Sequence, residues 1–403
     1  MLVADVQTFV VGNPPPGKGG RYFLFVKVVT DHGVVGWGEA YGATFGPAVM
    51  EAAIADVADR YLVGEDPHRI ERFWRRAYSS GFSQRPDPTL MACVSALEMA
   101  CWDIVGKEAD QPVHQLLGGR VHDRLRTYTY LYPISGSAVP TETEGPTVYD
   151  DPDLAAGAAV LAVEQGFTAV KFDPAGPYTA YDGHQPRQAD IGLSVSMVSA
   201  IRDAVGSRAD ILFGAHGQFT PSGATRLARA IEPYDPLWFE EPVPPDAPVA
   251  MAEVARSTMI PVAAGERLTT SYEFAALLRA GAASILQPNL GRAGGILEGK
   301  KIAALAEVHH AQIAPHCYCG PVVAAANAQL AACIPNFLIL EAIGTFDGFH
   351  AELLVEPLEW DDGDLIVTDR PGLGVELNES VLAAHPYDPT GPLHLEMTDQ
   401  AVF

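Results

Sequence analysis

Residues 209–219 read ADILFGAHGQF, an apolar run that ends in a glycine, an alanine and His216. The run has the length of one buried strand, so the question is what ends the other strands of the chain. Short apolar segments of this kind recur from residue 125 to residue 342, each followed by a helical pattern. Eight such units over about 220 residues predict a (β/α)8 barrel. The segments are 125–133, 167–174, 209–216, 236–241, 260–266, 283–289, 312–316 and 336–342.

The polar residues that end six of these strands recur at the length of one strand-and-helix unit. Their separations are 24, 26, 23, 27 and 25 residues. Strand ends converge on one mouth in a parallel barrel, so we expect these side chains to share a cavity with Lys171 and Asp173 from the second strand. A doubly wound open sheet is the structural alternative, but the Gly-rich phosphate turn after its first strand is missing. The six residues are His216, Glu240, Glu266, Asn289, His316 and Glu341.

The regions outside the barrel follow other patterns. Residues 21–41 alternate around the turn TDHG and predict an antiparallel hairpin, and three helical patterns follow up to residue 109. Residues 348–379 read as a loop, a short hairpin and turns. We therefore expect an α+β domain at 1–122, the barrel at 123–345, and a tail at 346–403 that packs back against the first domain.

The composition excludes several classes of partner. The formal net charge is −24, with 26 lysine and arginine residues against 50 aspartate and glutamate residues. A field of that sign repels nucleic acid and anionic lipid, so neither is an expected partner. The start of the chain lacks the basic segment of a signal peptide, and no apolar run approaches the roughly 18 residues of a membrane span. The five cysteines show no CxxC spacing, so we expect a cytoplasmic protein with reduced thiols.

Glu240 and Glu266 end consecutive strands of the predicted barrel. Two carboxylates at neighbouring strand ends repel each other unless a cation or a proton lies between them. A hard divalent ion with oxygen ligands, most simply Mg²⁺, resolves the repulsion and lets an acidic protein hold an anionic substrate. The alternative is an ion pair within the protein, for instance between Glu266 and Arg267.

His216 and His316 end the third and seventh strands, which lie opposite each other in an eight-stranded ring. Imidazoles on two sides of a metal-bound substrate suit acid-base chemistry, because the pKa of an imidazole lies near neutral pH. Lys171 either neutralises developing negative charge or pairs with Asp173. Glu341 either meets a substrate carboxylate or forms a salt bridge at the rim.

Three Pro- and Gly-rich segments are candidate loops over the mouth, where specificity is often set. They span residues 12–21, 79–88 and 174–186. The predicted substrate-binding residues, in these loops and at the strand ends, are Arg21, His184, Arg267 and Asn289.

The motifs DHGVVGWGEAY, SALEMACWDIVGK, PVHQLLGG, WFEEPV, IPVAAGER, SILQPNLGRAGGI, IAPHCYCGP and PGLGVELNE occur in this order over nearly the whole chain. In this order they resemble the enolase superfamily, specifically its mandelate racemase subgroup and the galactonate dehydratase type of acid-sugar dehydratase. The resemblance implies an α/β fold, a modified TIM-like barrel with an N-terminal α+β capping domain completed by the C-terminal tail. It also implies Mg²⁺, abstraction of the proton α to a carboxylate, and an even-numbered homo-oligomer.

The resemblance also assigns roles by position. Glu240 and Glu266 match metal ligands, and His316 matches the acid/base residue of the seventh strand. Glu341 matches the residue that faces the substrate carboxylate. His216 matches the histidine that dehydratases of this type place two residues after their first metal ligand.

Three positions depart from the family pattern. Gly214 stands where the subgroup supplies its first metal ligand as an aspartate. Asp173, at the place of a racemase lysine, is the candidate replacement; His216 is the other, and its use as a ligand would remove the proposed base. Asn289 stands where the family has an aspartate paired with His316, and its amide oxygen is expected to accept a hydrogen bond from that imidazole.

These residues together predict a Mg²⁺-dependent dehydratase of a sugar acid, an aldonate or aldarate, that yields a 2-keto-3-deoxy acid. His216 is the expected base and His316 the expected acid. Because two histidines could also serve the two faces of one carbon, an epimerase or cycloisomerase is the first alternative. A catalytically silent relative that binds a sugar acid or a protein partner is the second.

Overall fold

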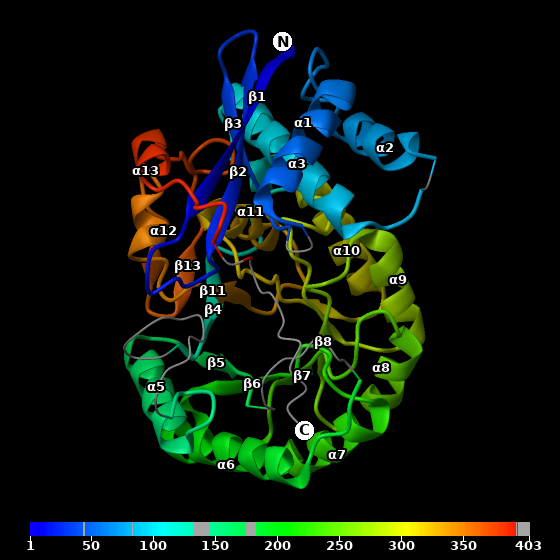
Figure 1. Ribbon diagram of the computed structural model, residues 1–403, viewed down its shortest axis with the longest axis vertical. Helices are drawn as coiled ribbons and strands as arrows, with labels where there is room; N and C mark the ends of the chain where they lie inside the picture. The colour runs from blue at the N-terminus through cyan, green and yellow to red at the C-terminus, as the bar shows by residue number, and fades with distance from the viewer. Residues whose placement is uncertain (43–44, 83, 133–145, 175–182, 392, 394–403) are drawn as a thin grey trace.

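The lower part of the molecule in Figure 1 is a closed barrel of parallel strands. Each strand from β4 to β10 pairs in parallel with the next, and β11 pairs in parallel with β4. The ring closes beside β10 through a bridge between Ile313 and Phe337. The predicted barrel is therefore confirmed. The computed structural model describes residues 1–42, 45–82, 84–132, 146–174, 183–391 and 393.

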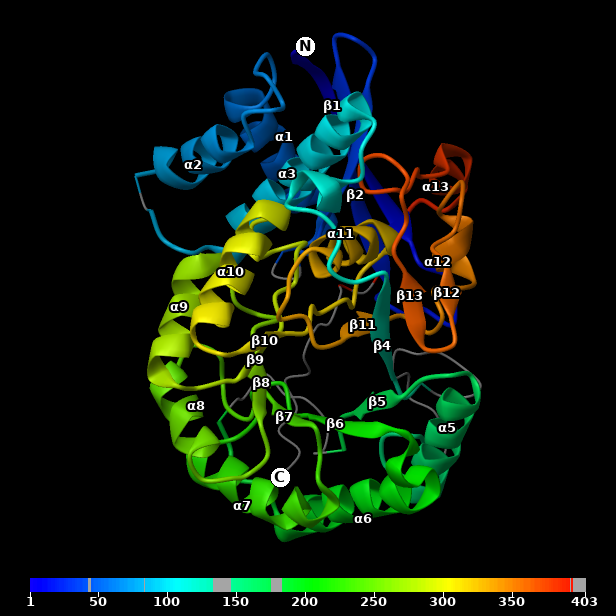
Figure 2. The same cartoon turned by 180° about the vertical axis from the view of Figure 1, so that it is seen from behind.

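The barrel strands alternate with helices that cover its outside (Figures 1 and 2). The strands are β4 (Arg124–Tyr130), β5 (Ala169–Phe172), β6 (Asp210–Gly214), β7 (Trp238–Glu240), β8 (Val262–Ala264), β9 (Ile285–Leu286), β10 (Gln312–Ile313) and β11 (Leu340–Ala342). The helices are α5 (Pro152–Glu164), α6 (Gln188–Val205), α7 (Pro221–Ile231), α8 (Pro248–Ala255), α9 (Thr270–Ala280), α10 (Ile296–Val308) and α11 (Pro321–Ala332), with 3-10 turns η1 (Gly206–Arg208) and η2 (Glu232–Tyr234).

The inside of the barrel is packed with side chains. One buried residue from each strand, or from its immediate flank, joins a separate apolar cluster that mixes small and large side chains. A filled interior leaves space for chemistry only beyond the carboxyl ends of the strands. The cluster consists of Tyr128, Ala169, Leu212, Trp238, Ala263, Ile285, Ala314 and Ile339.

The N-terminal part forms an antiparallel sheet covered by helices (Figure 1). The predicted hairpin is present, and the sheet has a third strand at the start of the chain that the sequence analysis did not predict. The three predicted helices are present within a few residues of their expected ends. The elements are β1 (Val3–Gly12), β2 (Tyr22–Thr30), β3 (Val35–Ala40), α1 (Pro47–Tyr61), α2 (Ile70–Ser80), α3 (Pro88–Ala109) and the short α4 (Val113–Leu116).

α3 is the central helix of this part. Asp87 caps it by accepting hydrogen bonds from the backbone N–H groups of Thr89 and Leu90, and Pro88 occupies the first turn. Among the described residues it is the one helix whose length and hydropathy would suit a membrane span, so the expectation that no run approaches that length is wrong. Because 78% of its apolar window is buried inside the protein, its apolarity is explained by packing.

The tail connects the barrel to the N-terminal sheet (Figures 1 and 2). Its hairpin pairs antiparallel with the start of β4 and so extends the barrel sheet. Further along, Pro386 bridges to Val11 in β1, and Glu379 forms a salt bridge with Lys27 in β2. The capping domain is thus completed by residues from the far end of the chain. The tail elements are α12 (Phe349–Glu352), β12 (Trp360–Asp361), β13 (Asp364–Ile366) and α13 (Glu379–Ala384).

Candidate active site

Three side chains from neighbouring strands converge at the mouth of the barrel. Glu240 ends β7, Glu266 lies two residues beyond β8, and His216 lies two residues beyond β6. One possible ligand atom from each lies within 4.8 Å of the other two. Both carboxylates are buried. Two carboxylates and an imidazole at this spacing form a candidate site for a divalent cation.

Glu240 is held by three donors. Its Oε1 lies 2.5 Å from Lys171 Nζ, and its Oε2 accepts hydrogen bonds from Trp238 Nε1 at 3.0 Å and Gln287 Nε2 at 2.7 Å. The alternative that Lys171 pairs with Asp173 is therefore wrong, because the ammonium group pairs with Glu240 instead. Burial raises the pKa of Glu240, although the charge of Lys171 opposes that shift. This lysine places a fixed positive charge beside the candidate metal site.

His216 is fixed between two carboxylates. Its Nδ1 lies 2.9 Å from Asp173 Oδ2, and its Nε2 lies 3.6 Å from Glu266 Oε1. The hydrogen bond to Asp173 puts a proton on Nδ1 and leaves Nε2 facing the cluster. Burial disfavours the imidazolium, but the charges of Asp173 and Glu266 outweigh it and raise the pKa of His216 to about 9. His216 also has a φ of +43°, so its turn is held in a conformation that costs about 1–2 kcal/mol.

Asp173 occupies the space that a side chain at position 214 would need. A Cβ built on Gly214 would lie 1.7 Å from Asp173 Oδ1. Gly214 pairs with Glu240 across β6 and β7, so this space borders the carboxylate cluster. A carboxylate from β5 therefore stands where one from the end of β6 would otherwise be.

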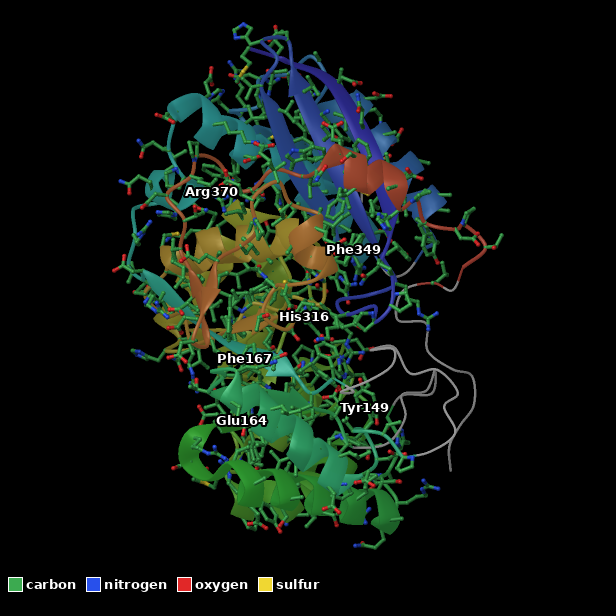
Figure 3. All side chains as sticks on the ribbon, turned by 90° about the vertical axis from the view of Figure 1, so that its left-hand side faces the viewer. Tyr149, Glu164, Phe167, His316, Phe349 and Arg370 are labelled. Carbon is green, nitrogen blue, oxygen red and sulfur yellow. The ribbon has the colours of Figure 1, made fainter. Side chains whose placement is uncertain are left out.

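His316 lies on the other side of Glu266, in the interior between the N-terminal sheet and the lower barrel (Figure 3). Its Nε2 is 3.5 Å from Glu266 Oε2 and 3.7 Å from Glu341 Oε2. Glu341 Oε2 also accepts a hydrogen bond from the backbone N–H of Cys317 at 2.7 Å. His216 and His316 thus both lie beside the carboxylate of Glu266, and Glu341 lies beside His316. Burial lowers the pKa of His316, although Glu341 and Glu266 oppose that shift.

The contact between Asn289 and His316 differs from the expectation. The backbone N–H of Gly291 donates to Asn289 Oδ1 at 2.8 Å, which leaves the amide nitrogen, not the oxygen, 2.7 Å from His316 Nδ1. The prediction that the amide oxygen accepts from the imidazole is therefore wrong. Because the amide nitrogen donates, His316 Nδ1 is an acceptor and the proton of the neutral ring lies on Nε2.

The donor set fits a divalent cation. Glu266 Oε2 is buried, and no described residue donates a hydrogen bond to it. A buried carboxylate oxygen without a donor is costly unless a cation or water meets it. Carboxylate oxygens are the ligands that Mg²⁺ prefers, and an imidazole in the same cluster also suits transition metals.

The other predicted substrate-binding residues are not members of the three-residue cluster. Arg267 Nε donates to Glu241 Oε2 at 2.7 Å, so the alternative ion pair of Arg267 with Glu266 is wrong. His184 forms an isolated bridge with Phe219, just beyond the turn of His216. Arg21 immediately precedes β2 and accepts a backbone hydrogen bond from Asn13. The predicted mouth loops at 79–88 and 174–186 include residues 83 and 175–182, which lie outside the described part of the chain.

Two family models match most of the chain. Residues 18–118 match the mandelate racemase / muconate lactonizing enzyme N-terminal domain, and residues 153–381 match the enolase C-terminal domain-like family. The chain belongs to the enolase superfamily. The mandelate racemase subgroup within it is the one that the resemblance of the motifs indicated.

Individual superfamily members match most of the chain. D-xylonate dehydratase of Haloferax volcanii is 35% identical over 389 residues, 95% of this chain and 88% of that protein. D-galactonate dehydratase of Ralstonia nicotianae is 37% identical over 367 residues, 89% of this chain and 90% of that protein. The crystal structure of a mandelate racemase/muconate lactonizing enzyme from Sulfitobacter sp. superposes with a TM-score of 0.95 at 54% identity, covering 100% of this chain and 99% of that chain.

Four residues at this superfamily site were missed by the sequence analysis. Trp238 and Gln287 each stand two residues before a strand-end residue that was predicted, so the two-residue alternation of a strand could have found them. Tyr41 comes from the capping domain, and its ring lies 5.6 Å from the ring of His316. Arg292 stacks 4.2 Å from the centre of the Tyr41 ring. No local pattern in the sequence indicates that contact, because the two residues are about 250 positions apart.

Proposed function

We propose that this protein is a Mg²⁺-dependent dehydratase of a sugar acid, an aldonate or an aldarate. The proton α to the carboxylate is removed, the C3 hydroxyl leaves as water, and the resulting enol becomes a 2-keto-3-deoxy acid by tautomerisation. The curated relatives named dehydratases support this reaction class. The observation that carries the proposal is the pair of imidazoles on the two sides of Glu266, within reach of a second buried carboxylate.

The hydrogen bonds of the two histidines suit opposite roles. His216 carries its proton on Nδ1 toward Asp173, so in the neutral ring the lone pair of Nε2 faces the cluster and accepts the α proton. His316 accepts from Asn289 at Nδ1, so its Nε2–H faces the cluster and can donate toward a leaving hydroxyl. Lys171 supplies fixed positive charge beside the developing negative charge.

Glu240 and Glu266 are the proposed metal ligands, with Asp173 as the third. Asp173 is proposed because its carboxylate fills the space of the missing side chain at Gly214. His216 is the competing third ligand, because one of its ring nitrogens lies within 4.8 Å of a carboxylate oxygen of each glutamate. A bound divalent cation supplies positive charge that stabilises the carboxylate side of the substrate and lowers the pKa of the neighbouring imidazole.

Epimerisation is the second candidate function. It is favoured by one observation, that His216 and His316 approach Glu266 from two sides at nearly equal distances. Two bases on two faces of one carbon would exchange the α proton without loss of the C3 hydroxyl. The different partners of the two rings, a carboxylate and an amide, favour dehydration, because they place the ring protons differently.

A product screen separates these functions. The protein with Mg²⁺ is incubated with a set of aldonates and aldarates that includes D-galactonate and D-xylonate, and 2-keto-3-deoxy products are detected as semicarbazones. Dehydration gives a semicarbazone with at least one acid. Epimerisation gives none, but a new diastereomer appears in the NMR spectrum. Binding without any product would leave only the catalytically silent alternative.

A further inference from the structure

Gln218 is a buried glutamine whose side-chain amide has no hydrogen-bond partner within the described part of the chain. Its residue is 3% exposed, and neither its Oε1 nor its Nε2 has a hydrogen-bond partner among the described residues. Native proteins pair nearly all buried polar atoms, because an unpaired one costs free energy. An amide that finds no partner for either end among the residues that the structure describes therefore needs an explanation.

The backbone around Gln218 does not need the side chain. Its N–H donates to the carbonyl of Ala215, and its carbonyl accepts from the N–H of His184 at 3.0 Å. The preceding N–H, of Gly217, donates to the carbonyl of Glu241 at 2.6 Å. The turn between β6 and α7 is thus held by main-chain bonds, and the amide is not required to form it.

The position of Gln218 relates it to the chemistry. It lies two residues after His216, in the turn that begins where β6 ends at the barrel mouth. Such turns carry substrate contacts in barrel enzymes. An amide offers both a donor and an acceptor at one end, which matches a hydroxyl group or a pair of neighbouring hydroxyl groups.

We propose that Gln218 is a specificity-determining residue that binds the hydroxyl groups of the sugar acid. This inference rests on the proposed function, because it assigns a contact of the same substrate. The bound substrate would pair the amide for which the described residues offer no partner. A residue that lowers the stability of the free protein is therefore retained at this position because it contributes to binding of the substrate.

A second buried glutamine in the same chain provides a matched control. Gln329 is 1% exposed, but its Oε1 accepts from His114 at 2.9 Å and its Nε2 donates to the carbonyl of Leu373 at 3.1 Å. The two glutamines are equally buried and differ in whether the protein pairs them. Methionine has nearly the same shape as glutamine but no amide. Gln329→Met therefore removes two hydrogen-bonded groups, whereas Gln218→Met removes an amide that has no partner among the described residues.

The test compares Gln218→Met with Gln329→Met in thermal unfolding and in binding of D-galactonate and D-xylonate by calorimetry. We expect Gln218→Met to unfold at the same or a higher temperature than the wild type, and to bind the acid about 10-fold more weakly. Gln329→Met should unfold at a lower temperature and bind normally. Gln218→Leu is a second variant of the same kind if methionine packs poorly.

The outcomes are distinct. A lower unfolding temperature for both Gln218 variants, with unchanged affinity, would show that the amide is paired within the protein or by water, and would overturn the inference. Binding to the wild type and to Gln218→Met with equal affinity would also overturn it, while the proposed dehydratase function would stand. If the wild type binds neither acid, the result would count against both the role of Gln218 and the proposed dehydratase function.

Discussion

At the scale of single residues, Asp173 and Gly214 compete for one position. Since a Cβ at 214 would lie 1.7 Å from Asp173 Oδ1, any side chain there displaces that carboxylate. The residue at 214 and the residue at 173 are therefore coupled, although they lie on different strands. The sequence shows the glycine at 214, but it does not show that Asp173 fills the space of a side chain at that position.

This coupling predicts the behaviour of an exchange variant. Asp173→Ala is expected to weaken Mn²⁺ binding by about 10- to 100-fold, because a ligand or its partner is lost. The double variant Asp173→Gly with Gly214→Asp should recover much of that affinity, since it returns a carboxylate to the same space from β6. The measurement is a titration with Mn²⁺ followed by electron paramagnetic resonance. Asp190→Ala, which removes an exposed ion pair with Arg187, is the control.

Two results would decide against Asp173 as a ligand. Unchanged Mn²⁺ affinity in Asp173→Ala would remove it from the site. Nitrogen hyperfine coupling to bound Mn²⁺ that disappears in His216→Asn would identify the imidazole as the ligand instead, and would take the proposed base away from proton transfer.

The strand-end residues were predictable because their spacing follows from the length of one strand-and-helix unit. Their partners were not. Lys171 pairs with Glu240 instead of Asp173, and Asn289 turns its nitrogen toward His316. Both choices depend on rotamers and on one backbone N–H, that of Gly291, which no local pattern encodes.

At the scale of elements, β3 and α3 are in unusually close contact. A Cβ built on Gly38 would lie 1.8 Å from the carbonyl oxygen of Ala96, and one on Gly36 would lie 2.1 Å from that of Ala100. The two glycines therefore let the strand lie directly on the helix backbone. The glycines of the hairpin and the helical pattern were both visible in the sequence, but the close contact between them was not.

Substitution of these glycines tests the contact. Gly38→Ala is expected to lower the free energy of unfolding by about 2–4 kcal/mol, because a strand must move away from a helix carbonyl that cannot yield. Gly192→Ala in α6 is the control, since a Cβ there meets no atom within 4 Å. It should be neutral or stabilising by up to about 1 kcal/mol. Urea unfolding measures both, and an equal effect of the two substitutions would contradict the packing account.

At the scale of the whole molecule, buried polar side chains connect the capping domain, the barrel and the tail. Glu98 in α3 accepts hydrogen bonds from the N–H groups of Ile296 and Leu297 at the start of α10. Glu39 in β3 does the same for Gly320 and Val323 at the start of α11. Carboxylates at helix N-termini are favoured by the helix dipole. These contacts place the capping domain over the barrel mouth.

His350 in α12 connects the tail to both other parts (Figure 3 labels its neighbour Phe349). Its Nε2 lies 3.1 Å from the carbonyl oxygen of Cys319, and its ring packs edge-on against Phe23 in β2. Burial lowers the pKa of His350 to about 4, although the carbonyl and Asp347 oppose that shift and Lys18 adds to it. The imidazole of His350 is therefore neutral in the folded protein at pH values where the same imidazole is already protonated in the unfolded chain.

The sign of the pH effect follows from this pKa. Between about pH 6.5 and pH 4 the unfolded chain binds a proton at His350 that the folded protein does not. Stability from this group is complete above pH 6.5 and is lost as the pH falls toward 4, by at most about 1.4 kcal/mol per pH unit. His350→Gln should show a shallower loss over this range in urea unfolding. The same slope in wild type and His350→Gln, with His32→Gln as the exposed control, would refute the prediction.

The division into a capping α+β domain, a barrel and a returning tail could be predicted at this scale, because hydrophobic period and turn residues are local. The pairing of β13 with β4 could not, since it joins segments about 240 residues apart. Strand β1 was missed because its polar residues Asp5 and Gln7 interrupt the apolar pattern of an edge strand.

The central claim, proton abstraction followed by loss of the C3 hydroxyl at the His216, Glu240 and Glu266 cluster, is tested most directly by proton NMR in D₂O. The wild type with Mg²⁺ and a turned-over aldonate should give a 2-keto-3-deoxy acid with one deuterium at C3, and His216→Asn should slow its formation by about 10²- to 10⁴-fold while still binding Mg²⁺. Product formation at the wild-type rate by His216→Asn, or by Glu266→Gln, would contradict the account.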